Sequence, residues 1–183
     1  MQLVVAVAIF FTSLAIAWGN RTAVATILAA TALEFAATVL RLWQPSRTTQ
    51  ALDVVSLLLL VIALSAVLGL VVYGPGRVTI HRILGAIAIY LNTAAAFAFA
   101  YRILAAGSAA AFGPRPFAPH GHPLANLVYF SLATLTTSGY GDVVPVEPFA
   151  RSLANLEAVI GQLYPPTLLA RLVTLELQSR TAE

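Results

Sequence analysis

The sequence predicts an all-α integral membrane protein with about five transmembrane helices and one short re-entrant helix. Of its 183 residues, 60% are hydrophobic and only 9% are charged, and the mean hydropathy is +0.88. The apolar residues gather in long segments that short polar breaks separate. A soluble domain of this length needs more polar surface. The charged residues are therefore expected at the ends of membrane spans.

Five long apolar segments follow one another along the chain. A helix needs about 20 residues to cross about 30 Å of hydrocarbon, and the last four segments meet this requirement. The first is shorter, but it lacks a basic region and a clear cleavage site, so we expect a retained span and not a secretion signal. The segments are Leu3–Trp18, Thr22–Leu42, Ala51–Tyr73, His81–Ala105 and Phe149–Thr174.

The connection between the last two spans differs from the others. Residues 107–123 contain four prolines and three glycines, which predicts an extended turret. Leu124–Thr136 then has the pattern of a helix of about 13 residues, which is too short to span a bilayer and fits a re-entrant segment. Pro123 suits the first position of that helix.

The composition also limits the possible partners. Cysteine is absent, so the chain has neither disulfides nor thiolate metal ligands. All ten basic residues are arginines, the net charge is only +3, and no basic run suggests nucleic acid. We therefore expect the lipid bilayer and permeant cations as partners, with no nucleic acid and no organic cofactor.

The residues between the short helix and the last span have the pattern of an ion-coordinating loop. Residues 136–142 read Thr-Thr-Ser-Gly-Tyr-Gly-Asp. Backbone carbonyls can replace the hydration shell of a cation if successive carbonyls point one way, which requires left-handed backbone angles that glycine adopts without steric cost. Gly139 and Gly141 alternate with Ser138 and Tyr140 and supply this pattern.

This Thr-x-Gly-Tyr-Gly-Asp motif, between two long spans, resembles the selectivity filter of the tetrameric potassium-channel superfamily, bacterial type. The resemblance extends over about 82–171. It implies a passive potassium channel, not an enzyme, that is a homotetramer with one filter strand per subunit. Potassium ions would bind the carbonyls of Thr137, Ser138, Gly139 and Tyr140 and the Thr137 hydroxyl, with Gly141 completing the strand.

The apolar segments before the matching region and the composition predict a domain organisation and a location. Residues 1–78 would form a three-helix membrane scaffold. Residues 79–183 would form the pore module, with outer helix, turret, pore helix, filter and inner helix. The protein would be a multi-pass protein of the cell membrane, and the Ala- and Arg-rich composition suits a bacterial inner membrane.

Residues flanking the filter both support the resemblance and depart from it. Thr136 leads into the filter, and Asp142 would guard its outer mouth. Ser138 stands where the family commonly has Val or Ile. Ala133 stands where some members have a Glu that braces the filter aspartate, so Asp142 needs another partner or water. These departures keep two alternatives open: a weakly selective cation channel, and a non-conducting membrane subunit of a larger channel or transporter.

The last span contains four further candidate residues. Glu157 either faces the cavity, where its field concentrates cations, or faces the pore helix and braces the filter in place of the missing Glu. Gly161 stands where inner helices often have a hinge glycine. Pro165 and Pro166 follow, and prolines inside a helix predict a bend. The bend is either a static kink or a gate hinge.

In the second span, Glu34 falls in the middle of the membrane, where a carboxyl group is costly. It is expected either to contact Asn92, or to be protonated or bond with a threonine such as Thr31 or Thr38. A voltage-sensor helix would carry arginines at every third residue through the membrane. The third segment has no arginine, so the sequence predicts a scaffold around the pore and not a voltage sensor of that type.

Overall fold

The computed structural model describes residues 21–74, 79–108, 110–113 and 123–181. The first predicted span and most of the turret lie outside the described residues. The described part has five helices and one small two-stranded sheet. The chain divides into two compact units, one of Met1–Pro75 with Thr79–Ile89 and the other of Gly76–Val78 with Tyr90–Glu183.

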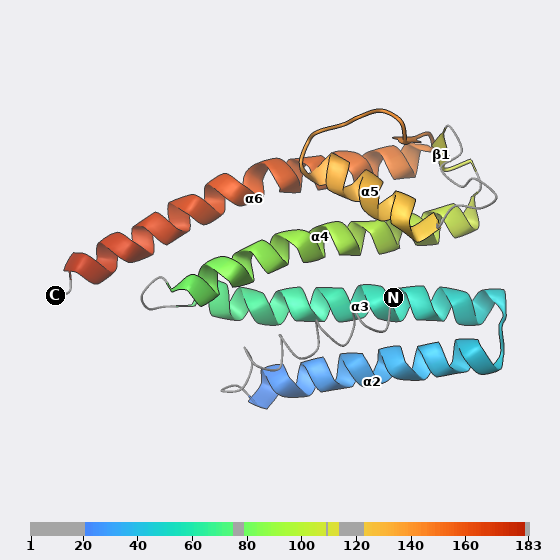
Figure 1. The fold of residues 1–183 in the computed structure, drawn as a ribbon, viewed down its shortest axis with the longest axis horizontal. Helices are drawn as coiled ribbons and strands as arrows, with labels where there is room; N and C mark the ends of the chain where they lie inside the picture. Colours follow the sequence, from blue (N-terminus) through green and yellow to red (C-terminus); the bar gives the residue numbers. More distant parts are fainter. Residues whose placement is uncertain (1–20, 75–78, 109, 114–122, 182–183) are drawn as a thin grey trace. The chain divides into compact units, whose positions relative to one another are not determined.

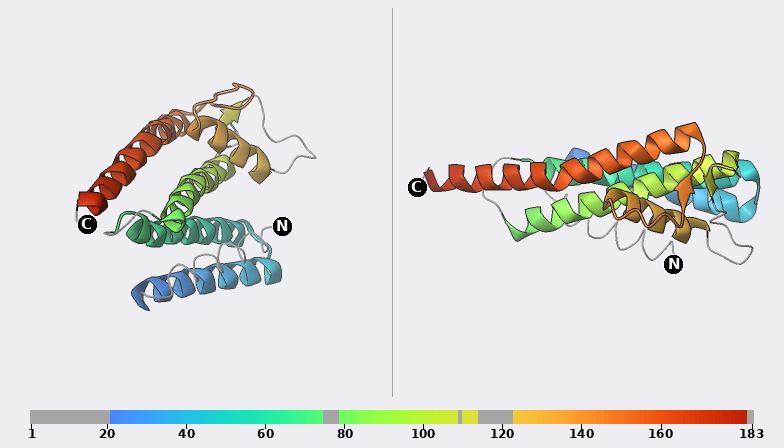
Figure 2. Two further views of the ribbon diagram at one scale, coloured as in Figure 1. Left: turned by 60° about the vertical axis from the view of Figure 1, so that its left-hand side comes forward. Right: turned by 90° about the horizontal axis from the view of Figure 1, so that it is seen from above.

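The first unit is built on a helical hairpin. Helices α2 (Arg21–Trp43) and α3 (Arg47–Val72) lie antiparallel and side by side (Figures 1 and 2). Ser46 is the N-cap of α3, and its side chain accepts a hydrogen bond from the backbone amide of Thr49, whose side chain in turn accepts one from the amide of Ser46. The apolar core of the hairpin comprises Ala23, Ile27, Leu60, Leu64 and Val67.

The second unit contains the predicted pore elements. Helix α4 (Ile80–Gly107) begins in the first unit and continues in the second. Helix α5 (Pro123–Leu135) has 13 residues and packs against α6 (Pro148–Thr181) (Figure 1). The predicted short helix is confirmed, and it begins at Pro123 as predicted.

A short sheet joins the two ends of the pore loop. Strand β1 (Phe112–Gly113) pairs antiparallel with β2 (Val144–Pro145), with Phe112 opposite Pro145 and Gly113 opposite Val144. The amide of Val146 extends the pairing by donating to the carbonyl of Ala111 over 2.8 Å. The first part of the predicted turret is thereby tied to the segment that follows the filter motif.

Three described helices are long and apolar enough to cross a membrane: Thr22–Trp43, Arg47–Leu70 and Ile80–Gly107. They match the second, third and fourth predicted spans and indicate an all-α, multi-pass membrane protein. The last predicted span lies in α6, which has 34 residues but is more polar, and which continues through both prolines. Its ribbon changes direction along its length (Figures 1 and 2), in the manner that prolines inside a helix produce.

Candidate functional site

The filter motif has the backbone angles that the glycines predict. Gly139 and Gly141 have positive φ values of 51° and 79°. Thr137 also has a positive φ, of 57°, and is the only non-glycine residue among those described to do so. Left-handed angles thus occur at every second residue from 137 to 141. A side chain makes this conformation costly, so the surroundings of Thr137 hold its backbone in the left-handed region. The residue type at position 137 does not predict a left-handed angle.

The chain enters the filter directly from the end of α5. A helix leaves its last carbonyls without partners in the helix. Here backbone amides from residues 136–139 donate hydrogen bonds to three of these carbonyls. The amides of Thr136, Thr137 and Gly139 donate to the carbonyls of Leu132, Thr134 and Ala133, over 3.0, 2.9 and 3.1 Å respectively. The start of the filter is therefore folded back onto the pore helix.

The Ser138 side chain has a partner within the same strand. Its hydroxyl lies 3.0 Å from the Thr136 hydroxyl, and the Thr136 hydroxyl lies 2.7 Å from the Leu132 carbonyl. Ser138, which stands where the family commonly has Val or Ile, adds a hydroxyl group to the strand. The structure places that group against Thr136, where the two hydroxyls link the filter strand to the last turn of α5.

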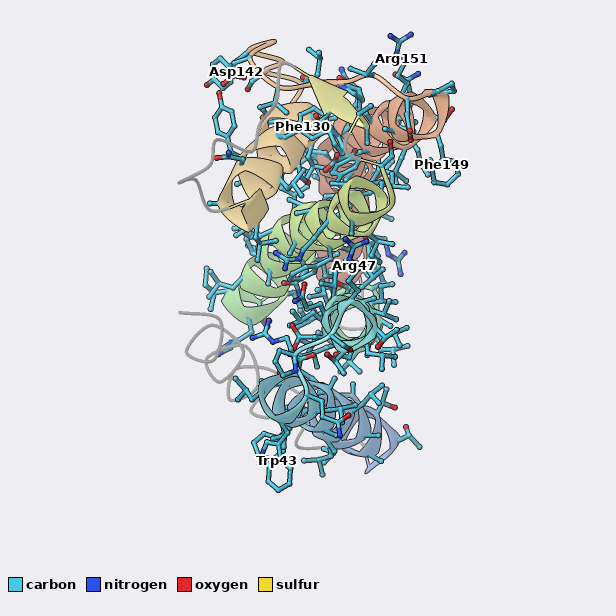
Figure 3. All side chains as sticks on the ribbon, turned by 90° about the vertical axis from the view of Figure 1, so that its right-hand side faces the viewer. Trp43, Arg47, Phe130, Asp142, Phe149 and Arg151 are labelled. Atoms are coloured by element: carbon cyan, nitrogen blue, oxygen red, sulfur yellow. The ribbon has the colours of Figure 1, made fainter. Side chains whose placement is uncertain are left out.

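Tyr129 of α5 supports the outer end of the filter motif. Its ring stacks on that of Tyr140, with centroids 6.0 Å apart and planes 9° apart. Its hydroxyl interacts with the carboxylate of Asp142, which also accepts a bond from the amide of Val143 over 3.0 Å. Figure 3 shows Asp142 pointing away from α6. Asp142 thus has the alternative partner that Ala133 makes necessary, although sequence reasoning did not identify Tyr129.

Glu157 lies at the centre of a buried polar cluster behind the pore helix, which we call the pore cluster: Tyr101 and the Ala94 carbonyl of α4, Ser131 of α5 and Glu157 of α6. The Glu157 side chain is fully buried. Its carboxylate contacts the hydroxyl of Ser131 and accepts a 2.6 Å bond from that of Tyr101. Ser131 also donates to the Ala94 carbonyl over 2.7 Å. This geometry favours the bracing alternative for Glu157 over the cavity alternative.

An aromatic group surrounds the Tyr101 end of the pore cluster. Tyr101, Phe112 and Phe130 contact one another edge to face, with centroids 5.0 to 5.5 Å apart. Such edge-to-face pairs add stability beyond their buried area. Phe130 points into the interior of this unit, whereas Phe149 and Arg151 point away from it (Figure 3). The carboxylate of Glu157 therefore lies in apolar surroundings with hydroxyl groups as its partners.

Gly161 lies where α6 comes very close to the end of the pore helix. A Cβ atom at position 161 would lie 1.9 Å from the carbonyl oxygen of Leu135, the last residue of α5. That oxygen also accepts a 3.1 Å hydrogen bond from the hydroxyl of Tyr90. The ring centroids of Tyr90 and Tyr164 are 5.6 Å apart. Gly161 is thus required for packing, whether or not it serves as a hinge.

Pro165 and Pro166 lie inside α6. Because proline has no amide hydrogen, the carbonyls of Gly161 and Gln162 lose the donors that a regular helix gives them. The hydroxyl of Thr167 donates to the neighbouring carbonyl of Leu163 over 2.7 Å. The helix therefore stays continuous with a weakened backbone ladder just beyond Gly161, which is where the sequence predicts the bend.

A second buried polar cluster lies in the hairpin, and we call it the scaffold cluster: Glu34, Thr38 and Arg41 of α2 with Asp53 and Ser56 of α3. Arg41 forms a 2.8 Å ion pair with Asp53. Thr38 lies 3.2 Å from the Glu34 carboxylate and 3.0 Å from that of Asp53, and Ser56 contacts Glu34. The predicted bond between Glu34 and Thr38 is confirmed. The contact with Asn92 stays a prediction.

Comparison with known proteins identifies the class to which this arrangement belongs. A sequence model of the family described as "Ion channel" matches residues 86–177, which is half of the chain. The chain therefore belongs to this ion-channel family, within the potassium-channel superfamily. Membership indicates a transport protein of the membrane.

Three curated relatives match this chain over 59 to 80 residues. The chain is 39% identical over 80 residues to protein LctB of Geobacillus stearothermophilus, covering 42% of this chain and 59% of that protein. It is 39% identical over 75 residues to the inward rectifier potassium channel Kirbac3.1 of Paramagnetospirillum magnetotacticum, covering 41% and 23%. It is 39% identical over 59 residues to two pore potassium channel c of Oryza sativa subsp. japonica, covering 31% and 13%.

The chain thus spans less than two thirds of the length of each of these relatives. No solved structure matches the chain significantly.

Proposed function

We propose that this chain is one subunit of a homotetrameric, passive, potassium-selective channel whose filter strand runs from Thr137 to Gly141. The observation that carries the proposal is the alternation of left-handed backbone angles at Thr137, Gly139 and Gly141, directly after a helix too short to cross the bilayer. This alternation lets successive carbonyls turn toward one axis, where they replace the hydration shell of the ion. Membership of the ion-channel family and the names of two relatives, both potassium channels, support potassium as that ion.

The same proposal assigns roles to the individual residues. The carbonyls of Thr137, Ser138, Gly139 and Tyr140 and the Thr137 hydroxyl would bind potassium, and one strand cannot surround an ion alone. The Tyr140 side chain is 71% exposed in the single chain, which supports packing against a neighbouring copy. Asp142 would add negative charge at the outer mouth, and such charge attracts cations.

Glu157 would brace the filter through the pore helix and not line the cavity. Its contact with Ser131 holds the back of α5, and its contact with Tyr101 connects the same carboxylate to α4. The bend near Pro165 and Pro166 would give the inner helix its shape as a static kink or serve as a gate hinge, and both alternatives remain compatible with the conducting role.

The experiment uses the purified chain in liposomes and compares two glycine variants. A Cβ added at Gly139 or at Gly69 would meet nothing within 4 Å, but only Gly139 has a positive φ. Gly139→Ala should therefore abolish potassium-driven rubidium uptake because alanine resists the left-handed angle. Gly69→Ala, inside α3, should leave uptake unchanged. Equal uptake by both variants would contradict the proposed filter.

Selectivity and assembly are measured separately. Reversal potentials in mixed potassium and sodium should follow the potassium gradient, and the mass of the purified assembly should equal four chains. Ser138, whose hydroxyl bonds with Thr136 inside the filter strand, motivates the second candidate, a weakly selective cation channel. A reversal potential near zero would favour that candidate. A folded chain without any flux would favour a non-conducting subunit.

A further inference from the structure

The last carbonyl of the pore helix has a different kind of partner from the three before it. The carbonyls of Leu132, Ala133 and Thr134 accept bonds from backbone amides of the filter entrance. The carbonyl of Leu135 instead accepts its bond from a side chain of another helix, the hydroxyl of Tyr90 in α4, over 3.1 Å. Leu135 itself is fully buried. A buried carbonyl without a donor costs free energy, so Tyr90 satisfies a need that the local chain does not meet.

The same carbonyl is enclosed from a third helix. The backbone of α6 at Gly161 comes so close that a methyl group there would overlap the Leu135 oxygen at 1.9 Å. The Tyr90 ring also contacts the Tyr164 ring, three residues further along α6. The end of the pore helix is therefore held between a hydroxyl of the outer helix and the backbone of the inner helix.

The filter begins directly beyond this point. Leu135 is the last helical residue, and Thr137 has the first left-handed backbone angle two residues later. The Leu135 carbonyl and the Thr136 amide belong to one rigid, planar peptide group. The position of this carbonyl therefore fixes the plane of that group. A displacement of this carbonyl would consequently change the direction in which the filter strand starts.

We propose that Tyr90 is a positioning residue for the filter: its hydroxyl fixes the last carbonyl of the pore helix against the inner-helix backbone at Gly161. Tyr90 would not touch the permeant ion. It would act through Leu135 on the first peptide groups of the filter. This inference rests on the proposed function, since it assigns a residue that determines how well the filter discriminates between potassium and sodium.

The test is Tyr90→Phe in the full chain, reconstituted in liposomes. This variant keeps the ring that contacts Tyr164 and removes the hydroxyl, so the helices should still fold. We expect the permeability ratio of potassium to sodium, from reversal potentials, to fall about two- to tenfold, the range that corresponds to one hydrogen bond. Tyr73→Phe, which removes a hydroxyl at the end of α3 in the other unit, is the matched control and should leave the ratio unchanged.

A double variant tests whether Tyr90 and Gly161 act on the same group. Gly161→Ala should also lower the ratio because its methyl group displaces the Leu135 carbonyl. In Tyr90→Phe/Gly161→Ala the combined loss should be smaller than the product of the two separate losses, as expected for residues that share a partner. Losses that multiply independently would overturn the shared role.

Each outcome separates this inference from the proposed function. Absence of potassium flux through the unsubstituted chain would refute the proposed function itself. Selective flux through the unsubstituted chain with an unchanged ratio in Tyr90→Phe would refute only the role of Tyr90. Loss of the helical circular dichroism spectrum in Tyr90→Phe would mean that the hydroxyl is needed for folding, and it too would overturn the positioning role.

Discussion

The scaffold cluster and the pore cluster solve the same problem in different ways. The scaffold cluster buries two carboxylates, Glu34 and Asp53, and the pore cluster buries one, Glu157. Burial inside an apolar helical unit is costly unless such a group finds partners. In the scaffold cluster Asp53 pairs with the guanidinium of Arg41. In the pore cluster the described partners of Glu157 are hydroxyl groups, those of Ser131 and Tyr101.

The difference lies in what each cluster connects. The ion pair joins two helices of one hairpin, so its geometry depends on the short connection between α2 and α3. The Glu157 carboxylate joins three elements of the pore unit, and two hydroxyl groups at its two oxygens specify their spacing. The scaffold cluster thus adds an ion pair to a carboxylate, Glu34, that hydroxyl groups hold, whereas the described partners of Glu157 in the pore cluster are hydroxyl groups alone.

The largest loss in the free energy of unfolding is expected from breaking the ion pair between Arg41 and Asp53. Arg41→Leu leaves the buried Asp53 carboxylate without its cation, and such a change costs about 3–5 kcal/mol when the pair is buried. The Arg41 side chain is 28% exposed, so a loss near the lower end of that range is expected. Thermal unfolding of the purified protein in detergent measures it.

Arg47→Leu is the matched control for this change, because the Arg47 side chain is exposed at the start of α3. Selective conduction by the folded fraction should persist in Arg41→Leu. If the two variants unfolded at the same temperature, the ion pair would not stabilise the hairpin. The proposed difference between the scaffold cluster and the pore cluster would then be refuted.

An intermediate effect is expected when the acceptors of the pore cluster are removed. Glu157→Leu leaves the hydroxyls of Ser131 and Tyr101 without that acceptor, at about 1–3 kcal/mol for a group left unsatisfied. Glu157→Gln keeps an acceptor for Tyr101 and a donor toward Ser131, so it should retain folding and rubidium uptake. Uptake and unfolding temperature are measured for both variants. Similar losses in the two would mean that the charge of Glu157, and not its hydrogen-bond geometry, is required.

The smallest effect is expected from removing one hydroxyl from each cluster. Ser131→Ala and Thr38→Val should each cost about 1 kcal/mol, as for a single hydrogen bond. Only Ser131→Ala should change the potassium-to-sodium permeability ratio, because Ser131 lies on the pore helix. A change of the ratio in Thr38→Val of the same size would show that the scaffold also positions the filter.

The fold could be predicted where local pattern determines it. The length of α5, its start at Pro123 and the apolar spans all follow from composition and breakers, and the alternating glycines predict the backbone of the filter. The domain boundary between 78 and 79, the roles of the filter residues and the ion stay predictions. The first span lies outside the described residues.

The site could be predicted only in part, because its supports come from distant positions. Glu157 was identified as a possible brace, but Tyr101 lies 56 residues before it and Ser131 lies 26 before it. Tyr90 and Tyr129 gave no signal, since an aromatic residue in an apolar helix is usual. Gly161 was identified for its position in the pattern, while its contact with Leu135 depends on how closely two helices approach.

The sequence distances within the two clusters also bear on how the protein is made. Arg41 and Asp53 are 12 residues apart, so their ion pair can form as soon as α3 has been synthesised and inserted. The contact of Tyr101 with Glu157 must wait until the ribosome has added 56 more residues. During that interval the Tyr101 hydroxyl lacks its final partner. The nascent chain therefore acquires a complete hairpin early, while the interior of its pore unit is completed only after α6 has been synthesised.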